Sequence, residues 1–185
     1  MSQFLRMMSK MINWTTLLHQ VFDLELDVDE AKELTIGPEA RKQTIFVALD
    51  VELAKLANSN GWFNVLDQPT EDAPKAFEHY LKSLELLLLF SAKQQWTHLI
   101  VMDQKQWDLI KRTKPTTKLA DLNKQYLAIK HFLNDAYYNH RQESFRHAWH
   151  LLIKWGMVDL GFSSEEITTK YKELIEQQRA HWVKD

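Results

Sequence analysis

Residues 84–90 read Leu-Glu-Leu-Leu-Leu-Leu-Phe and lie within a longer segment, 74–93, that has no proline or glycine after its first residue. Apart from Glu85, the seven residues are apolar around the whole circumference of a helix. This pattern is typical of a helix that other helices surround. We therefore predict a helix from Pro74 to Lys93 at the centre of a helical bundle.

The segments before this helix also show helical spacing, because their apolar residues recur every three or four positions. One helix is predicted to begin after Asn13, a residue type that caps helix N-termini. The Gly-Pro pair at 37–38 interrupts the pattern, and a second helix is predicted over 39–58. The acidic, proline-containing segment 67–74 is predicted to be a loop.

The C-terminal half continues the same pattern. Ser163, followed by Glu165 and Glu166, resembles a capping box and predicts the start of a last helix. The other predicted helices are a short one over 103–109, one capped by Thr116 or Thr117, and one over 142–155 that ends at Gly156. No segment alternates with the period of a β-strand. The prediction is an all-α bundle of about six helices in a single domain, 11–185, preceded by a loose extension over 1–10.

Composition narrows the classes of function. The chain has 23 Lys and Arg against 25 Asp and Glu, and a formal net charge of −2, so no strong field attracts nucleic acid or an anionic membrane. The absence of cysteine excludes disulfide scaffolds and thiolate metal sites. No apolar run approaches the length of a membrane span, and the first ten residues lack the apolar core of a secretory signal. We expect a cytoplasmic protein without nucleic-acid or membrane partners.

Four segments, in order along the chain, form a pattern that the helical spacing alone does not explain. The central pair is Val51-Glu52-Leu53-Ala54-Lys55-Leu56-Ala57-Asn58, with Trp62-Phe63 after it, and Glu78-His79-Tyr80-Leu81-Lys82-Ser83 before the apolar run. The outer pair is Leu18-His19-Gln20-Val21-Phe22-Asp23 and Leu160-Gly161-Phe162-Ser163-Ser164-Glu165-Glu166-Ile167. Together they resemble the motifs of the all-α, dimeric dUTPase family, which is related to the MazG-type nucleotide pyrophosphohydrolases.

The resemblance implies a homodimer that hydrolyses dUTP to dUMP with Mg²⁺. In the family, acids at two positions on each of two facing helices hold the metal, since Mg²⁺ prefers an octahedron of oxygen ligands. The matching positions in this chain are Glu52, Lys55, His79 and Lys82. Only one acid remains, and with a neutral histidine the formal charge of the four positions changes from about −4 to about +1.

The base-binding positions of the family have also changed. Its glutamine on the first helix falls on His19, whereas Asp23 is kept. The resemblance therefore predicts a dUTPase-like protein that does not carry out ordinary Mg²⁺-dependent hydrolysis and needs no cofactor. Its expected nucleotide-binding residues are His19, Asp23, Lys55 and Lys82, with a deoxyuridine nucleotide as the ligand. Glu52 would be a metal ligand only if a metal binds.

Within this interpretation, Lys55 and Lys82 are expected to replace the charge of the metal and to pair with Glu52. The result is either a structural scaffold or a protein that binds the phosphates of a nucleotide. One alternative is an active dUTP or dUDP pyrophosphohydrolase with a rearranged metal site, in which Glu52, Glu78, Glu85 and His79 hold Mg²⁺ or Mn²⁺. The other alternative is an unrelated helical module for protein interaction.

Overall fold

A computed structural model describes residues 10–66 and 72–183, and all the regular structure in these ranges is helical. The predicted extension over 1–10, apart from residue 10, and most of the predicted loop over 67–74 lie outside the described residues. The described residues form seven α-helices, together with a 3₁₀ turn η1 (Thr97–Leu99) and a π-helical turn η2 (Trp155–Asp159). The α-helices are α2 (Trp14–Ala31), α3 (Pro38–Asn60), α4 (Ala73–Lys93), α5 (Gln104–Arg112), α6 (Leu119–Asn139), α7 (Gln142–Lys154) and α8 (Ser164–Trp182).

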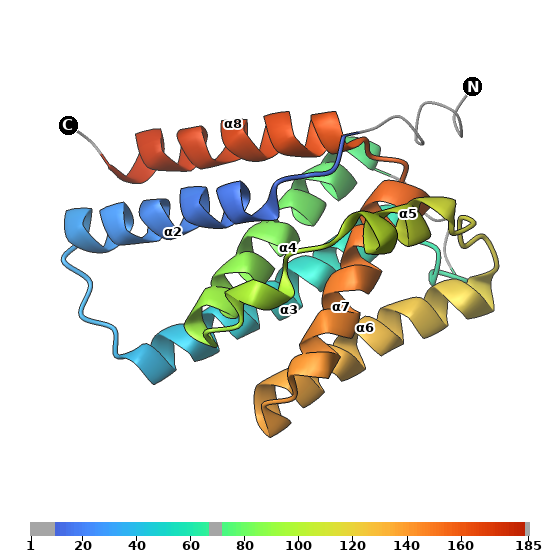
Figure 1. The fold of residues 1–185 in the computed structure, drawn as a ribbon, viewed down its shortest axis with the longest axis horizontal. Coiled ribbons are helices and arrows are strands. Elements are labelled where there is room, and N and C mark those ends of the chain that lie inside the picture. The colour runs from blue at the N-terminus through green and yellow to red at the C-terminus, as the bar shows by residue number, and fades with distance from the viewer. Residues whose placement is uncertain (1–9, 67–71, 184–185) are drawn as a thin grey trace.

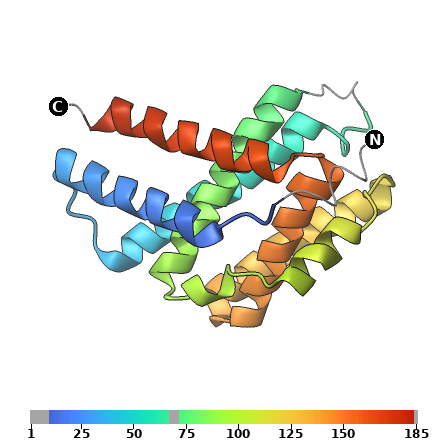
Figure 2. The ribbon, with the colours of Figure 1, turned by 45° about the horizontal axis from the view of Figure 1, so that its top comes forward.

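The long helices associate in pairs. Helices α3 and α4 form one pair, α6 and α7 a second, and α2 lies beside α8 in a third (Figures 1 and 2). Helix α4 also packs against α2 and α8, so it has neighbours on several sides. Its residues Leu84, Leu87, Leu88 and Phe90 are buried in one continuous apolar core. The predicted all-α fold and the central position of this helix are confirmed.

Local sequence signals fix several helix ends. The Asn13 side chain accepts a hydrogen bond from the Thr16 amide at the start of α2, and Ser163 and Glu166 form a complete capping box at the start of α8. Helix α3 ends at Gly61, whose left-handed backbone suits glycine. These three boundaries lie at or within a few residues of those that the sequence predicts.

One predicted boundary is wrong, and contacts that are distant in sequence explain the difference. Neither Thr116 nor Thr117 caps α6, which begins after Lys118. The Thr116 amide instead donates to Asp159, and the Thr116 hydroxyl bonds Lys154.

The helix that begins at Gln142 ends at Lys154, one residue before the predicted end at Trp155, and the chain continues through Gly156 in the π-helical turn η2, which the sequence did not predict. Glycine is required there by packing. A Cβ atom at this position would lie 2.0 Å from the ring of Tyr80 on α4, and that ring is fully buried. The turn thus brings its backbone against α4 at a point where no side chain fits.

None of the helices in the described ranges carries an apolar stretch long enough to cross a bilayer.

The contact at Gly156 gives a test of the fold. Gly156→Ala is expected to lower the free energy of unfolding by about 2–3 kcal/mol, because the buried Tyr80 ring cannot move aside without disturbing the core. Gly37→Ala is the matched control, since no atom lies within 4 Å of the added Cβ, and its effect should stay within about 1 kcal/mol. Urea unfolding followed by circular dichroism measures both. Equal midpoints for the two variants would contradict the packing of Tyr80 against Gly156.

Candidate functional site

The paired helices α3 and α4 bring three of the four metal-site positions of the resemblance into contact. Glu52 is buried, and its Oε1 accepts a hydrogen bond from the Lys55 ammonium at 2.8 Å. Its Oε2 lies 2.8 Å from Nδ1 of His79 on α4. An ionised carboxylate only accepts hydrogen bonds, so Nδ1 is the nitrogen that carries the proton. We call these three residues the Glu52 cluster.

The cluster keeps Glu52 charged. Burial by itself raises the pKa of the Glu52 carboxyl, but the hydrogen bonds from Lys55 and His79 outweigh it, and the pKa is lowered below the ordinary value. A carboxylate with a lowered pKa stabilises the folded protein above the unfolded pKa and loses that contribution as the pH falls. The Glu52 cluster is therefore a stable arrangement of charges at neutral pH.

This arrangement does not fit Mg²⁺. Each oxygen of Glu52 already has a hydrogen-bond donor, and the nearest charged neighbour is an ammonium rather than a second carboxylate. Across residues 10–66 and 72–183, no three acidic or histidine side chains come together in a way that could hold a metal ion. The dispersed charges also disfavour the rearranged metal site, because Glu78 lies largely exposed beside Lys82.

The remaining predicted site residues lie elsewhere. Lys82 is on α4, one turn beyond His79, and its ammonium is 3.7 Å from Glu78 on its own helix. The expected ion pair between Lys82 and Glu52 is thus replaced by a local one. His19 and Asp23 are exposed on α2, a helix that contributes nothing to the pocket described next.

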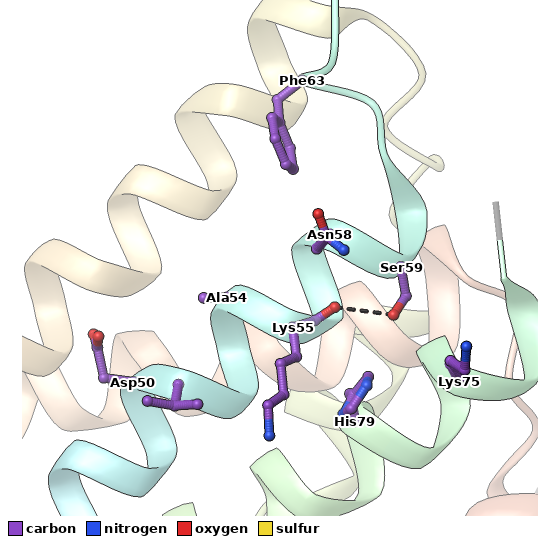
Figure 3. A pocket seen from close by; sticks show the side chains of 9 residues that line it. Asp50, Ala54, Lys55, Asn58, Ser59, Phe63, Lys75 and His79 are labelled. Atoms are coloured by element: carbon purple, nitrogen blue, oxygen red, sulfur yellow. Dashed lines mark hydrogen bonds between the residues drawn. The ribbon is translucent and has the colours of Figure 1, made fainter. Parts of the chain in front are cut away.

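An open pocket of about 540 Å³ lies directly beside the Glu52 cluster. Figure 3 shows Lys55 and His79 at one end, Phe63 at the other, and Asn58 and Ser59 between them. Lys75, in the first turn of α4, completes the end that holds His79. The pocket therefore has a cationic end, a neutral polar middle and an aromatic end.

The charged side chains that line the pocket form ion pairs but remain accessible to solvent. Lys55 pairs with Glu52, and Lys75 with Asp72 at 3.0 Å, yet both lysine side chains are more than half exposed. Each ammonium has three N–H donors and uses one of them in the ion pair. Asp50, the acid that lines the pocket, is paired with Lys130 of α6. The free donors of Lys55 and Lys75 are therefore available to an anionic ligand.

Sequence reasoning missed Ser59 and Lys75 as pocket residues. Ser59 follows Lys55 by four positions and donates its hydroxyl to the Lys55 carbonyl, so the two share a face of α3. Lys75 precedes His79 by four positions on α4. A step of one helical turn from Lys55 and from His79 leads to Ser59 and Lys75, so helical spacing could have identified both residues.

Glu85 is a second acid with an unusual environment. It projects from α4 toward α8 and accepts a hydrogen bond from the Gln178 amide at 3.0 Å. Burial raises the pKa of the Glu85 carboxyl to about 7, since neither Gln178 nor the charge of Lys82 compensates for the loss of water. Glu52 carries a negative charge nearby and adds to the shift.

The raised pKa of Glu85 predicts how stability changes with pH. The folded state holds the proton more tightly than the unfolded state, so the contribution of Glu85 to stability is fully present below pH 4.5 and is lost as the pH rises through about 7. Glu85→Gln removes the titration and keeps an acceptor for Gln178. We expect it to raise the free energy of unfolding at pH 8 by about 1–3 kcal/mol and to change it little at pH 5.

Glu52→Gln is the matched control for this measurement, because the pKa of Glu52 is shifted in the opposite direction. It should destabilise the protein at pH 7, and the difference from the wild type should shrink as the pH falls below 4.5 through the lowered pKa of Glu52. Urea unfolding at a series of pH values measures both variants. A Glu85→Gln protein less stable than the wild type at pH 8 would contradict the assigned environment of Glu85.

Comparison of the chain with protein-family models, with curated proteins and with solved structures finds no match.

Proposed function

We propose that this protein is a dUTPase-like helical protein that binds the phosphate groups of a nucleotide and does not hydrolyse them by the Mg²⁺-dependent route. The observation that carries the proposal is the pocket that Lys55 and His79 of the Glu52 cluster line together with Lys75. Lysine is a common phosphate ligand in proteins, and here two lysines from different helices face one pocket.

The local backbone supports an anion at this end of the pocket. Lys75 lies in the first turn of α4, where the helix dipole places partial positive charge. Its neighbour His79 is held in place through Nδ1 by Glu52, so the imidazole orientation is fixed before any ligand arrives. The Asp72 side chain already accepts from the Lys75 amide at this helix end, so the donors left for an anion are the remaining ammonium N–H groups of Lys55 and Lys75.

The same residues argue against metal-dependent catalysis. Mg²⁺ draws its ligands from carboxylate and carbonyl oxygens, and the one carboxylate of the cluster is engaged on both oxygens. An ammonium at the position of Lys55 repels a divalent cation at close range. Relative to the family pattern, Lys55 puts a cation where an acidic metal ligand is expected. The same change disfavours a metal ion and favours an anion, so both effects support one interpretation.

Phosphate binding is the first expected result. Isothermal titration calorimetry in the presence of EDTA should detect sodium tripolyphosphate and dUTP binding to the full chain. Lys55→Ala should weaken both by about 10-fold or more, because a charged hydrogen bond to phosphate is lost. Lys124→Ala, a change of an exposed lysine on α6 outside the pocket, is the control. Equal loss in the two variants, or no binding to the wild type, would refute the proposal.

The second expected result is that the protein does not hydrolyse dUTP with a metal ion. Protein at near-stoichiometric concentration is incubated with dUTP in parallel with Mg²⁺, with Mn²⁺ and with EDTA, and dUMP is measured by HPLC. We expect no dUMP above the protein-free control in any lane. Metal-dependent dUMP formation that disappears in Glu52→Ala would overturn the proposal and would instead support a rearranged active site.

A further inference from the structure

We infer that the outward side of α2 is a docking surface for a basic amphipathic helix of a partner protein. The inference goes beyond the proposed function, because no residue of α2 lines the pocket. We call this surface the α2 face, and it consists of Thr15, His19, Phe22, Asp23, Leu26 and Glu30.

The first support is that these six residues share one side of α2, and all six are exposed. Residues three, four or seven positions apart lie on the same side of a helix. The other sides of α2 are occupied. Leu17 and Leu24 are buried in the core, and Asp27 pairs with Arg179 of α8, the helix beside it (Figures 1 and 2). The α2 face is therefore the side of the helix that the rest of the chain leaves open.

The second support is the negative charge that this face carries. Two acids that turn toward α3 have a partner there, since Arg41 pairs with Glu25 at 3.2 Å and with Asp29 at 2.8 Å. By contrast, Asp23 and Glu30 form no ion pair with any of the residues that the structure describes. The fold compensates the inward acids of α2 and leaves the outward ones uncompensated.

The stability of α2 does not account for the outward acids. Glu30 lies in the last turn of the helix, where the helix dipole disfavours negative charge and no basic residue is present. Asp23 precedes Asp27 by four positions, a spacing at which like charges repel each other. Both acids weaken the isolated helix, and a cationic partner would offset both repulsions.

The third support is the apolar centre of the face. Phe22 and Leu26 are one turn apart, and they are 36% and 51% exposed. The Phe22 ring is held from one side by Lys93 of α4, whose ammonium lies 5.3 Å from the ring centroid. An exposed apolar pair between acids complements a helix that carries apolar anchors one turn apart with lysine or arginine beside them.

Charge and length narrow the class of partner. Negative charge repels nucleic acid and anionic membranes, so the cationic partner is a segment of protein. The face extends from Thr15 to Glu30, which corresponds to about 22 Å of helix. A partner helix of about four turns matches this length.

Fluorescence anisotropy with a labelled peptide and the full chain tests the inference. The probe is a peptide of about 16 residues made of leucine and lysine, with leucines at positions i, i+3, i+4 and i+7. We expect it to bind at least about 10-fold more tightly than a peptide in which glutamate replaces every lysine. Leu26→Ser should weaken binding by about 10-fold, and so should the double variant Asp23→Asn, Glu30→Gln.

Matched controls change the same kinds of residue elsewhere. Leu109→Ser alters a side chain of α5 that is 71% exposed, and the double variant Asp121→Asn, Glu143→Gln alters exposed acids on α6 and α7. Neither should change the affinity for the lysine peptide. Urea unfolding of Asp23→Asn, Glu30→Gln should give a midpoint equal to or above that of the wild type, because the two acids do not support the fold.

The outcomes decide the inference separately from the proposed function. It is overturned if the lysine peptide does not bind, if both peptides bind alike, or if the control variants weaken binding as much as the face variants do. A double variant less stable than the wild type would also count against it, since the acids would then serve the fold. Leu26→Ser should leave tripolyphosphate binding unchanged, so failure of the docking surface leaves phosphate binding standing.

Discussion

Helix α4 is in contact with α2, α3 and α8, so a polar side chain that projects from its interior turns meets another helix before it meets water. His79 faces α3 and finds Glu52, whereas Glu85 faces α8 and finds Gln178. Because the leucines of α4 are buried among other helices, the polar side chains on its interior turns must find their partners on those helices. The Glu52 cluster and the Glu85–Gln178 contact are the two results.

Glu52 and Glu85 show that the hydrogen-bond partner of a carboxyl group, and not burial alone, determines whether the group is charged. Burial raises the pKa of both carboxyls, but Glu52 has an ammonium and an imidazole N–H as donors, and its pKa falls below the ordinary value. Glu85 has a neutral amide, and its pKa rises to about 7. A buried carboxylate needs charged donors to remain ionised. Of these two acids, Glu52 is therefore the one that carries a stable negative charge at neutral pH.

Much of the fold follows from the sequence because it depends on local pattern. Local spacing of apolar residues predicts four of the helices, α2, α3, α4 and α8. The caps at Asn13 and Ser163 likewise depend on residues within a turn of one another. Thr116 and the π-helical turn at Gly156 could not be placed in this way, since Thr116 bonds Asp159 and Gly156 packs against Tyr80, both distant in the chain. The approach of His79 to Glu52 was expected from the resemblance, whereas the pairing of Lys82 with Glu78 depends on rotamers that spacing does not fix.

The Glu52 cluster also limits what the pocket can bind. If Glu52 had an open oxygen, it would repel an anion and attract a cation. With both oxygens engaged by Lys55 and His79, its charge is compensated inside the protein, and the remaining N–H donors of Lys55 point to solvent. Removal of Glu52 would free the lysine but would also release the imidazole from its fixed orientation. Under the proposed function, the carboxylate is a positioning group that holds two cationic or donor side chains ready for a phosphate.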